Sequence, residues 1–168
     1  RFANLCAALS VQHFGGSLVG RILFTAGLGG MGANQPRAMT MHGGVCLVVD
    51  ANPDIIPLRI QKKFLDVQVN TLEEGIALAE QAKAEGRALG IGLHGNAADL
   101  FPRALELGWK PDIVTEMCPC HDPISYIAAG HTVESAEAAR RADRLAYLEE
   151  ARESMKRQLT AMLGLSAA

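Results

Sequence analysis

The feature that most constrains the fold of this chain is a glycine-rich segment between two short apolar runs. The runs cover residues 21–26 and 45–50, and the segment contains Gly27, Gly29 and Gly32. Each run has the length and apolar character of a β-strand covered on both faces of a parallel sheet. Glycines at this spacing permit a tight turn, leave the backbone bare enough for a pyrophosphate to approach, and let the next helix pack closely on the strand. The order of strand, turn, helix and strand predicts a Rossmann-type nucleotide-binding unit.

Helical and strand-like segments alternate along the rest of the chain. Thr71 and Glu74 have the spacing of a helix capping box, and apolar residues follow at helical intervals until Gly86. We expect a helix that ends at Gly15-Gly16, strands at 21–26, 45–50, 89–93 and 112–116, helices at 36–42, 72–86 and 97–107, and a loop containing Asn52-Pro53. This alternation predicts an α/β fold: a Rossmann-like, three-layer, mostly parallel sheet with flanking helices and a long helical C-terminal tail.

The length of 168 residues favours one domain with one core. We divide it into an N-terminal helical segment (1–19), an α/β core (20–131) and a helical tail (132–168). The chain lacks an initiator methionine and begins in what reads as mid-helix, so we expect a fragment of a larger protein. A terminal helix that exposes Leu159, Met162 and Leu163 would leave an apolar stripe in water, which predicts packing against something outside the chain.

Charge and hydropathy exclude several classes of partner. The net charge of −2 comes from acids and bases mixed along the chain, so no basic stripe is available for nucleic acid. No apolar run approaches the roughly 20 residues that span a bilayer, and no signal-peptide pattern is present. The four cysteines are too few and too unevenly placed for a disulfide framework. We therefore expect a cytoplasmic protein with reduced thiols and no nucleic-acid or membrane partner.

Asp50 ends the second predicted strand, about 20 residues beyond the glycines. An acid at this position accepts hydrogen bonds from the adenosine ribose of NAD and repels the extra phosphate of NADP. The alternative is a structural glycine turn followed by an ordinary strand-end aspartate. Because strand, turn, helix, strand and acid occur in order, the sequence favours NAD as the cofactor.

Two further segments follow predicted strands and so belong to the carboxyl edge, where open α/β sheets bind ligands. In the first, Asn96 either only caps the next helix or both caps it and faces the cofactor. The second contains Cys118, Cys120 and His121. This cluster lacks the second ligand pair of a closed zinc site, so we predict no metal. A nucleophilic cysteine paired with His121, or a passive loop, remains open.

Longer motifs make the chain resemble a known family, the urocanases. The resemblance rests on His13-Phe14-Gly15-Gly16-Ser17-Leu18, Thr25-Ala26-Gly27-Leu28-Gly29-Gly30-Met31-Gly32, Gln35-Pro36, Gly43-Gly44-Val45-Cys46-Leu47, Gly92-Leu93, Gly95-Asn96-Ala97-Ala98, His121-Asp122-Pro123, Ser154-Met155 and Ala161-Met162-Leu163. It covers almost the whole chain, and ordinary dehydrogenases do not share the full length of the glycine-methionine segment.

The resemblance implies the inserted NAD domain of a urocanate hydratase, a hydro-lyase of histidine degradation that is a homodimer as the full enzyme. In this family NAD acts as an electrophile toward the imidazole ring, and water is added to urocanate without net hydride transfer. The resemblance assigns the catalytic cysteine and most of the substrate pocket to a core outside this chain, so we expect the fragment alone to be inactive.

Together the turn and the resemblance give the expected cofactor-binding residues. They are Gly27, Gly29, Gly30, Met31, Gly32, Asp50, Asn96, Ala97, Met117, Cys118, Pro119, Cys120, His121, Tyr126 and Ile127. No catalytic residue is expected in this chain.

The chain departs from the family pattern at three sets of residues and in the loop before Tyr126, which is one residue shorter. Family members usually have Glu at Asp50, Arg at Ile55, and Gln-Thr-Ser-Ala where this chain has Met117-Cys118-Pro119-Cys120. A paralogue that hydrates a modified urocanate, sulfur- or methyl-substituted, is therefore an alternative. An NAD(P)-dependent dehydrogenase domain and a noncatalytic NAD-binding module are the others.

Overall fold

A five-stranded parallel sheet forms the centre of the computed structural model, which describes residues 2–166. The strands are β1 (Ile22–Ala26), β2 (Val45–Asp50), β3 (Val67–Val69), β4 (Leu89–His94) and β5 (Ile113–Val114). Their order across the sheet is β3-β4-β2-β1-β5, and every pairing is parallel. The predicted Rossmann-like α/β fold is therefore confirmed.

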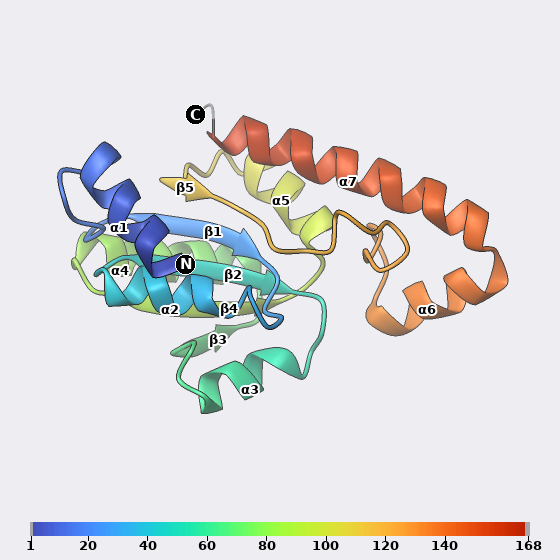
Figure 1. Cartoon of the computed structure of the whole chain (residues 1–168), viewed down its shortest axis with the longest axis horizontal. Coiled ribbons are helices and arrows are strands. Elements are labelled where there is room, and N and C mark those ends of the chain that lie inside the picture. The colour runs from blue at the N-terminus through green and yellow to red at the C-terminus, as the bar shows by residue number, and fades with distance from the viewer. Residues whose placement is uncertain (1, 167–168) are drawn as a thin grey trace.

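Helices cover both faces of the sheet, because alternate strand residues point to opposite sides. Phe24 and Leu47 face a core with residues of α4 (Leu72–Ala84), α5 (Ala97–Glu106) and α7 (Arg144–Ser166). Leu23 and Cys46 face the other core, beneath α1 (Phe2–His13), α2 (Asn34–Met41) and α3 (Ile55–Gln61). Figure 1 shows the resulting three layers, with α7 lying along α5.

Local sequence signals account for several helix boundaries. The side chain of Thr71 accepts a hydrogen bond from the N–H of Glu74 at 3.1 Å, as the capping-box spacing predicted. Asn96 caps α5 by accepting from the N–H of Ala98 at 2.9 Å. Pro36 lies in the first turn of α2, where its missing N–H leaves no helical hydrogen bond unmade.

The loop predicted after β2 contains two elements, α3 and β3, that the sequence analysis missed. Helix α3 has only seven residues, includes Pro57 and follows the turn residues Asn52-Pro53, so its sequence reads as a loop. Strand β3 has three residues, too few to show a periodicity, and its edge position depends on pairing with β4. Strand β5 is also shorter than the predicted 112–116.

The C-terminal tail consists of two helices, α6 (Val133–Ala142) and α7, separated at Asp143. The Asp143 carboxylate accepts from the N–H groups of Leu145 and Ala146, both at 3.0 Å, and so begins α7. Leu159 and Leu163 are 57% and 64% exposed, as expected. The prediction was wrong for Met162, which packs against the core beneath α7.

Candidate functional site

The carboxyl ends of β1, β2, β4 and β5 meet at one edge of the sheet, where the chain segments that follow these four strands enclose a cleft of about 210 Å³. In Figure 1 the arrowheads of β1 and β2 point toward the segment that leads into α6. Of the sequence-predicted site residues, the cleft is lined by Gly27, Gly29, Asp50, Asn96, Ala97, Met117, Cys118, Pro119, Tyr126 and Ile127. Val49 and Ala51, which flank Asp50, also line it, and their position beside the strand-end acid was the only signal for them.

The glycine turn combines close packing with open space. Gly27 has a φ of +91°, and a β-carbon on it would lie 2.7 Å from the carbonyl oxygen of Met117. A β-carbon on Gly32 would overlap the carbonyl oxygen of Gly27. At Gly29 and Gly30, by contrast, a β-carbon would meet no atom within 4 Å. The turn thus keeps its backbone uncovered in the middle and tightly packed at both ends.

Four consecutive N–H groups of this turn have no acceptor within the described residues 2–166. They belong to Gly29, Gly30, Met31 and Gly32, whereas the preceding N–H, of Leu28, donates to Asp50. Helix α2 follows directly, and its N-cap, Ala33, has no side chain that could bind them. Unpaired N–H groups at a helix N-terminus form a site for anions, phosphate in particular.

The carboxylate of Asp50 is held by the backbone on both of its oxygens. Oδ2 accepts from the N–H of Leu28 at 2.6 Å, and Oδ1 accepts from the N–H of Asn52 at 2.9 Å. Each oxygen keeps a second lone pair. Asp50 therefore stabilises the glycine turn and still presents acceptor capacity to the cleft that it lines.

The match to a protein family decides which kind of nucleotide-binding domain this is. The model of the urocanase family, described as the urocanase Rossmann-like domain, matches residues 3–168. The chain belongs to the urocanase family. The resemblance seen in the sequence is therefore confirmed. The assignment of the chain as the cofactor domain of a urocanate hydratase is also confirmed at the level of the family.

In this urocanase domain Asn96 connects the cleft to the long loop before α6. Its Nδ2 donates to the carbonyl oxygens of Ala128 at 2.6 Å, His131 at 3.2 Å and Ile127 at 3.3 Å, while its Oδ1 caps α5. Both polar atoms of Asn96 are thus engaged within the protein. Its position in the cleft wall fits the reading in which it caps the helix and also faces a ligand.

The helical tail braces the same loop from the other side. The Tyr126 hydroxyl donates to Gln158 of α7 at 2.5 Å, and the Tyr147 hydroxyl donates to the carbonyl oxygen of Tyr126 at 2.6 Å. Burial raises the pKa of Tyr126 above its usual value. The tail therefore positions the part of the cleft wall that contains Tyr126 and Ile127.

The cysteine loop of the urocanase domain does not favour thiolate chemistry. Burial raises the pKa of Cys118 well above its usual value, and the Glu116 carboxylate, which accepts from the Cys118 N–H at 2.7 Å, raises it further. Burial and Glu116 raise the pKa of Cys120 to about 12. His121 is exposed and bonds to neither thiol among the described residues. Within residues 2–166, no group of three or more His, Cys, Asp or Glu side chains could hold a metal ion.

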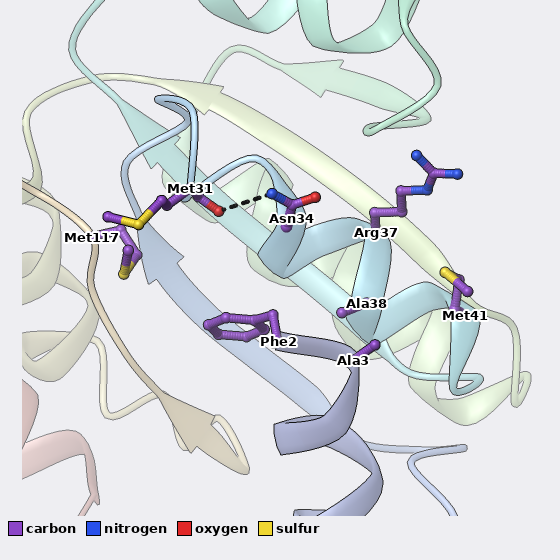
Figure 2. A pocket seen from close by; sticks show the side chains of 8 residues that line it. All are labelled: Phe2, Ala3, Met31, Asn34, Arg37, Ala38, Met41 and Met117. Carbon is purple, nitrogen blue, oxygen red and sulfur yellow. Dashed lines mark hydrogen bonds between the residues drawn. The ribbon is translucent and has the colours of Figure 1, made fainter.

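Not all predicted residues reach the cleft: Cys120, His121, Gly30, Gly32 and Met31 lie outside its lining. Met31 instead lies at the rim of a second cavity of about 540 Å³, shown in Figure 2. This cavity is mostly apolar and is lined by Phe2, Ala3, Met31, Asn34, Arg37, Ala38, Met41 and Met117. Met117 lines both hollows, so the second cavity adjoins the cleft.

Every helix within residues 2–166 is too short or too polar to span a lipid bilayer.

Proposed function

We propose that this domain binds NAD at the carboxyl edge of its sheet and holds it for the hydration of urocanate in a larger enzyme. The observation that carries the proposal is the row of unpaired N–H groups from Gly29 to Gly32, beside open space at Gly29 and Gly30. A pyrophosphate supplies acceptors for these donors, and its charge is favoured by the positive end of α2. The uncovered glycine backbone fits the close approach that the pyrophosphate requires.

The surroundings of the turn offer an acceptor for the ribose and space for the rest of the dinucleotide. Asp50 offers carboxylate lone pairs to the adenosine ribose, as strand-end acids do in NAD-binding folds. The 210 Å³ cleft is smaller than the roughly 300–1,000 Å³ of complete small-molecule sites. A neighbouring hollow of about 280 Å³ shares Ala51 and Asn96 with it, and the apolar cavity shares Met117. An elongated ligand therefore has space beyond the cleft in both neighbouring hollows.

In the proposed enzyme, NAD supplies an electrophile for the imidazole ring of the substrate. The residues of this chain bind and orient the dinucleotide, and the loop from Met117 to Ile127 forms one wall of the cleft. The family resemblance supports a catalytic cysteine and a substrate pocket outside this chain, so the domain alone has no hydratase activity. It also supports a homodimeric enzyme of histidine degradation in the cytoplasm.

A modified urocanate is the second candidate substrate. The departures from the family pattern at Met117 and Cys118 support it, because both residues line the cleft. If the enzyme prefers a sulfur- or methyl-substituted urocanate, the change of specificity maps to this loop.

Two measurements test the proposal. Calorimetry with this chain tests for NAD binding, which the unpaired N–H groups require. With the full enzyme, absorbance should show loss of the urocanate chromophore without accumulation of NADH, whereas stoichiometric NADH formation would support the dehydrogenase alternative. NAD binding without consumption of urocanate or its analogues would leave a noncatalytic NAD-binding module.

A further inference from the structure

Arg59 reaches the glycine turn from a different element of the fold. It lies on α3, and its Nε and Nη2 both donate to the carbonyl oxygen of Leu28, at 2.9 and 2.7 Å. The guanidinium also lies over the ring of Phe64, with 5.7 Å between the guanidinium carbon and the ring centroid. A planar, two-donor contact of this kind fixes the direction of the carbonyl group that it binds.

The N–H of Leu28 is held at the same time by Asp50. Leu28 is fully buried, so its backbone groups need partners within the protein. Asp50 fixes the peptide plane between Gly27 and Leu28, and Arg59 fixes the next plane, between Leu28 and Gly29. The two side chains thus set the orientation of two consecutive peptide groups at the start of the turn.

The second of these planes contains the first unpaired donor. The carbonyl of Leu28 and the N–H of Gly29 belong to one trans peptide, in which the two groups point in opposite directions. While Arg59 holds the carbonyl on its own side, the Gly29 N–H points away from Arg59. Gly29 lines the cleft and lacks a β-carbon that would restrict rotation of this peptide. A rotated peptide would present a carbonyl oxygen, which repels an anion.

We propose that Arg59 is a positioning residue for the pyrophosphate: through the Leu28 carbonyl it aims the N–H of Gly29 at the bound diphosphate. This inference rests on the proposed binding of a dinucleotide at the glycine turn. It assigns the guanidinium to the protein side of the turn, with the peptide group between it and the ligand.

The test compares Arg59→Met with Lys62→Met in this chain. Methionine retains a long apolar side chain against Phe64 but removes both donors. Lys62 ends the same helix, is exposed, and its side chain makes no hydrogen bond in the described part of the chain, so its variant removes one positive charge without touching the turn. We expect Arg59→Met to weaken the binding of NAD and ADP-ribose about 10- to 100-fold. This is the cost of losing one hydrogen bond to a charged group, here the bond from the Gly29 N–H to the diphosphate. Adenosine, which lacks phosphate, should bind both variants as it binds the unaltered chain.

Ionic strength separates positioning from simple attraction, because salt screens a long-range charge effect. The loss in Arg59→Met should persist at high salt, and Lys62→Met should bind NAD normally there. If Arg59→Met fails to fold, Arg59→Lys decides the question: it keeps the charge without the two-donor contact and should still lose NAD affinity. Wild-type NAD affinity in a folded Arg59 variant, or equal losses for NAD and adenosine, would overturn the positioning role alone. Absence of NAD binding to the unaltered chain would overturn the proposed function itself.

Discussion

The backbone of Gly32 lies against the carbonyl group of Gly27 so closely that a β-carbon on Gly32 would overlap the oxygen. Gly29, in the same turn, has open space where a β-carbon would be. The two glycines therefore serve different purposes. Gly32 lets the start of α2 approach the end of β1, and Gly29 leaves the backbone accessible to a ligand.

Substitutions at these two positions should affect different properties, ligand binding at Gly29 and stability at Gly32. Gly29→Val should keep the fold but abolish NAD binding, since its side chain fills the space that the pyrophosphate needs. Gly32→Ala should destabilise the fold by about 1–3 kcal/mol or more through overpacking. Thermal unfolding followed by circular dichroism, together with calorimetry, separates the two. Normal NAD binding to Gly29→Val would show that the turn is only structural.

Asp50 should determine the choice between NAD and NADP. The unaltered chain should prefer NAD, because the carboxylate opposes a 2′-phosphate. Asp50→Ala should weaken NAD about 10- to 100-fold. Asp50→Asn keeps an oxygen that can accept from the Leu28 N–H but removes the charge, so its preference for NAD should shrink. Calorimetry with both nucleotides measures this, and equal affinities in the unaltered chain would refute the assignment.

The parts of the site that the sequence predicted depend on local signals. The apolar runs, the glycines and Asp50 lie close together along the chain, and each element restricts the next. The helix cap at Asn96 is equally local, because it joins side chain and backbone two residues apart. The loop residues were predicted to belong to the site because of the family resemblance. The pattern of their side chains alone was compatible with several interpretations.

Contacts between distant segments were not accessible in the same way. Arg59 is separated from Leu28 by a helix, a strand and part of a second helix, and no periodicity connects them. It lies in α3, whose short, proline-containing sequence reads as a loop. The break of the tail at Asp143 was missed because an aspartate among many charged residues is not distinctive until its carboxylate is seen to cap α7.

Stability should fall in acid through Asp112. Burial by itself would raise the pKa of this carboxyl, but hydrogen bonds from Lys83, Arg21 and the Ile22 N–H outweigh it, and the pKa lies below its usual 3.8. A lowered pKa means that the folded state binds the proton less readily than the unfolded chain does. The stabilisation is therefore complete above the unfolded pKa and is lost as the pH falls through the folded value.

Urea unfolding of the chain and of Asp112→Asn measures this contribution. The unaltered chain should be the more stable at pH 7, and the difference should shrink below about pH 4 as Asp112 becomes protonated. Asp54→Asn, an exposed site, is a control that should change little. A difference that stays constant from pH 7 to pH 3 would mean that the ion pairs of Asp112 do not contribute.

Cys118 should react slowly with alkylating reagents, and bound NAD should protect it. Burial and the Glu116 carboxylate raise its pKa, so little thiolate exists near neutral pH, and the rate should rise about tenfold for each pH unit. Glu116→Gln removes one of the causes and should increase the rate. Cys120 also has a raised pKa but lies outside the cleft lining, so NAD should protect it less. Mass spectrometry after timed alkylation distinguishes the two thiols. Rapid modification of Cys118 at pH 7, unaffected by NAD, would restore the nucleophile hypothesis and remove this loop from the proposed cofactor site.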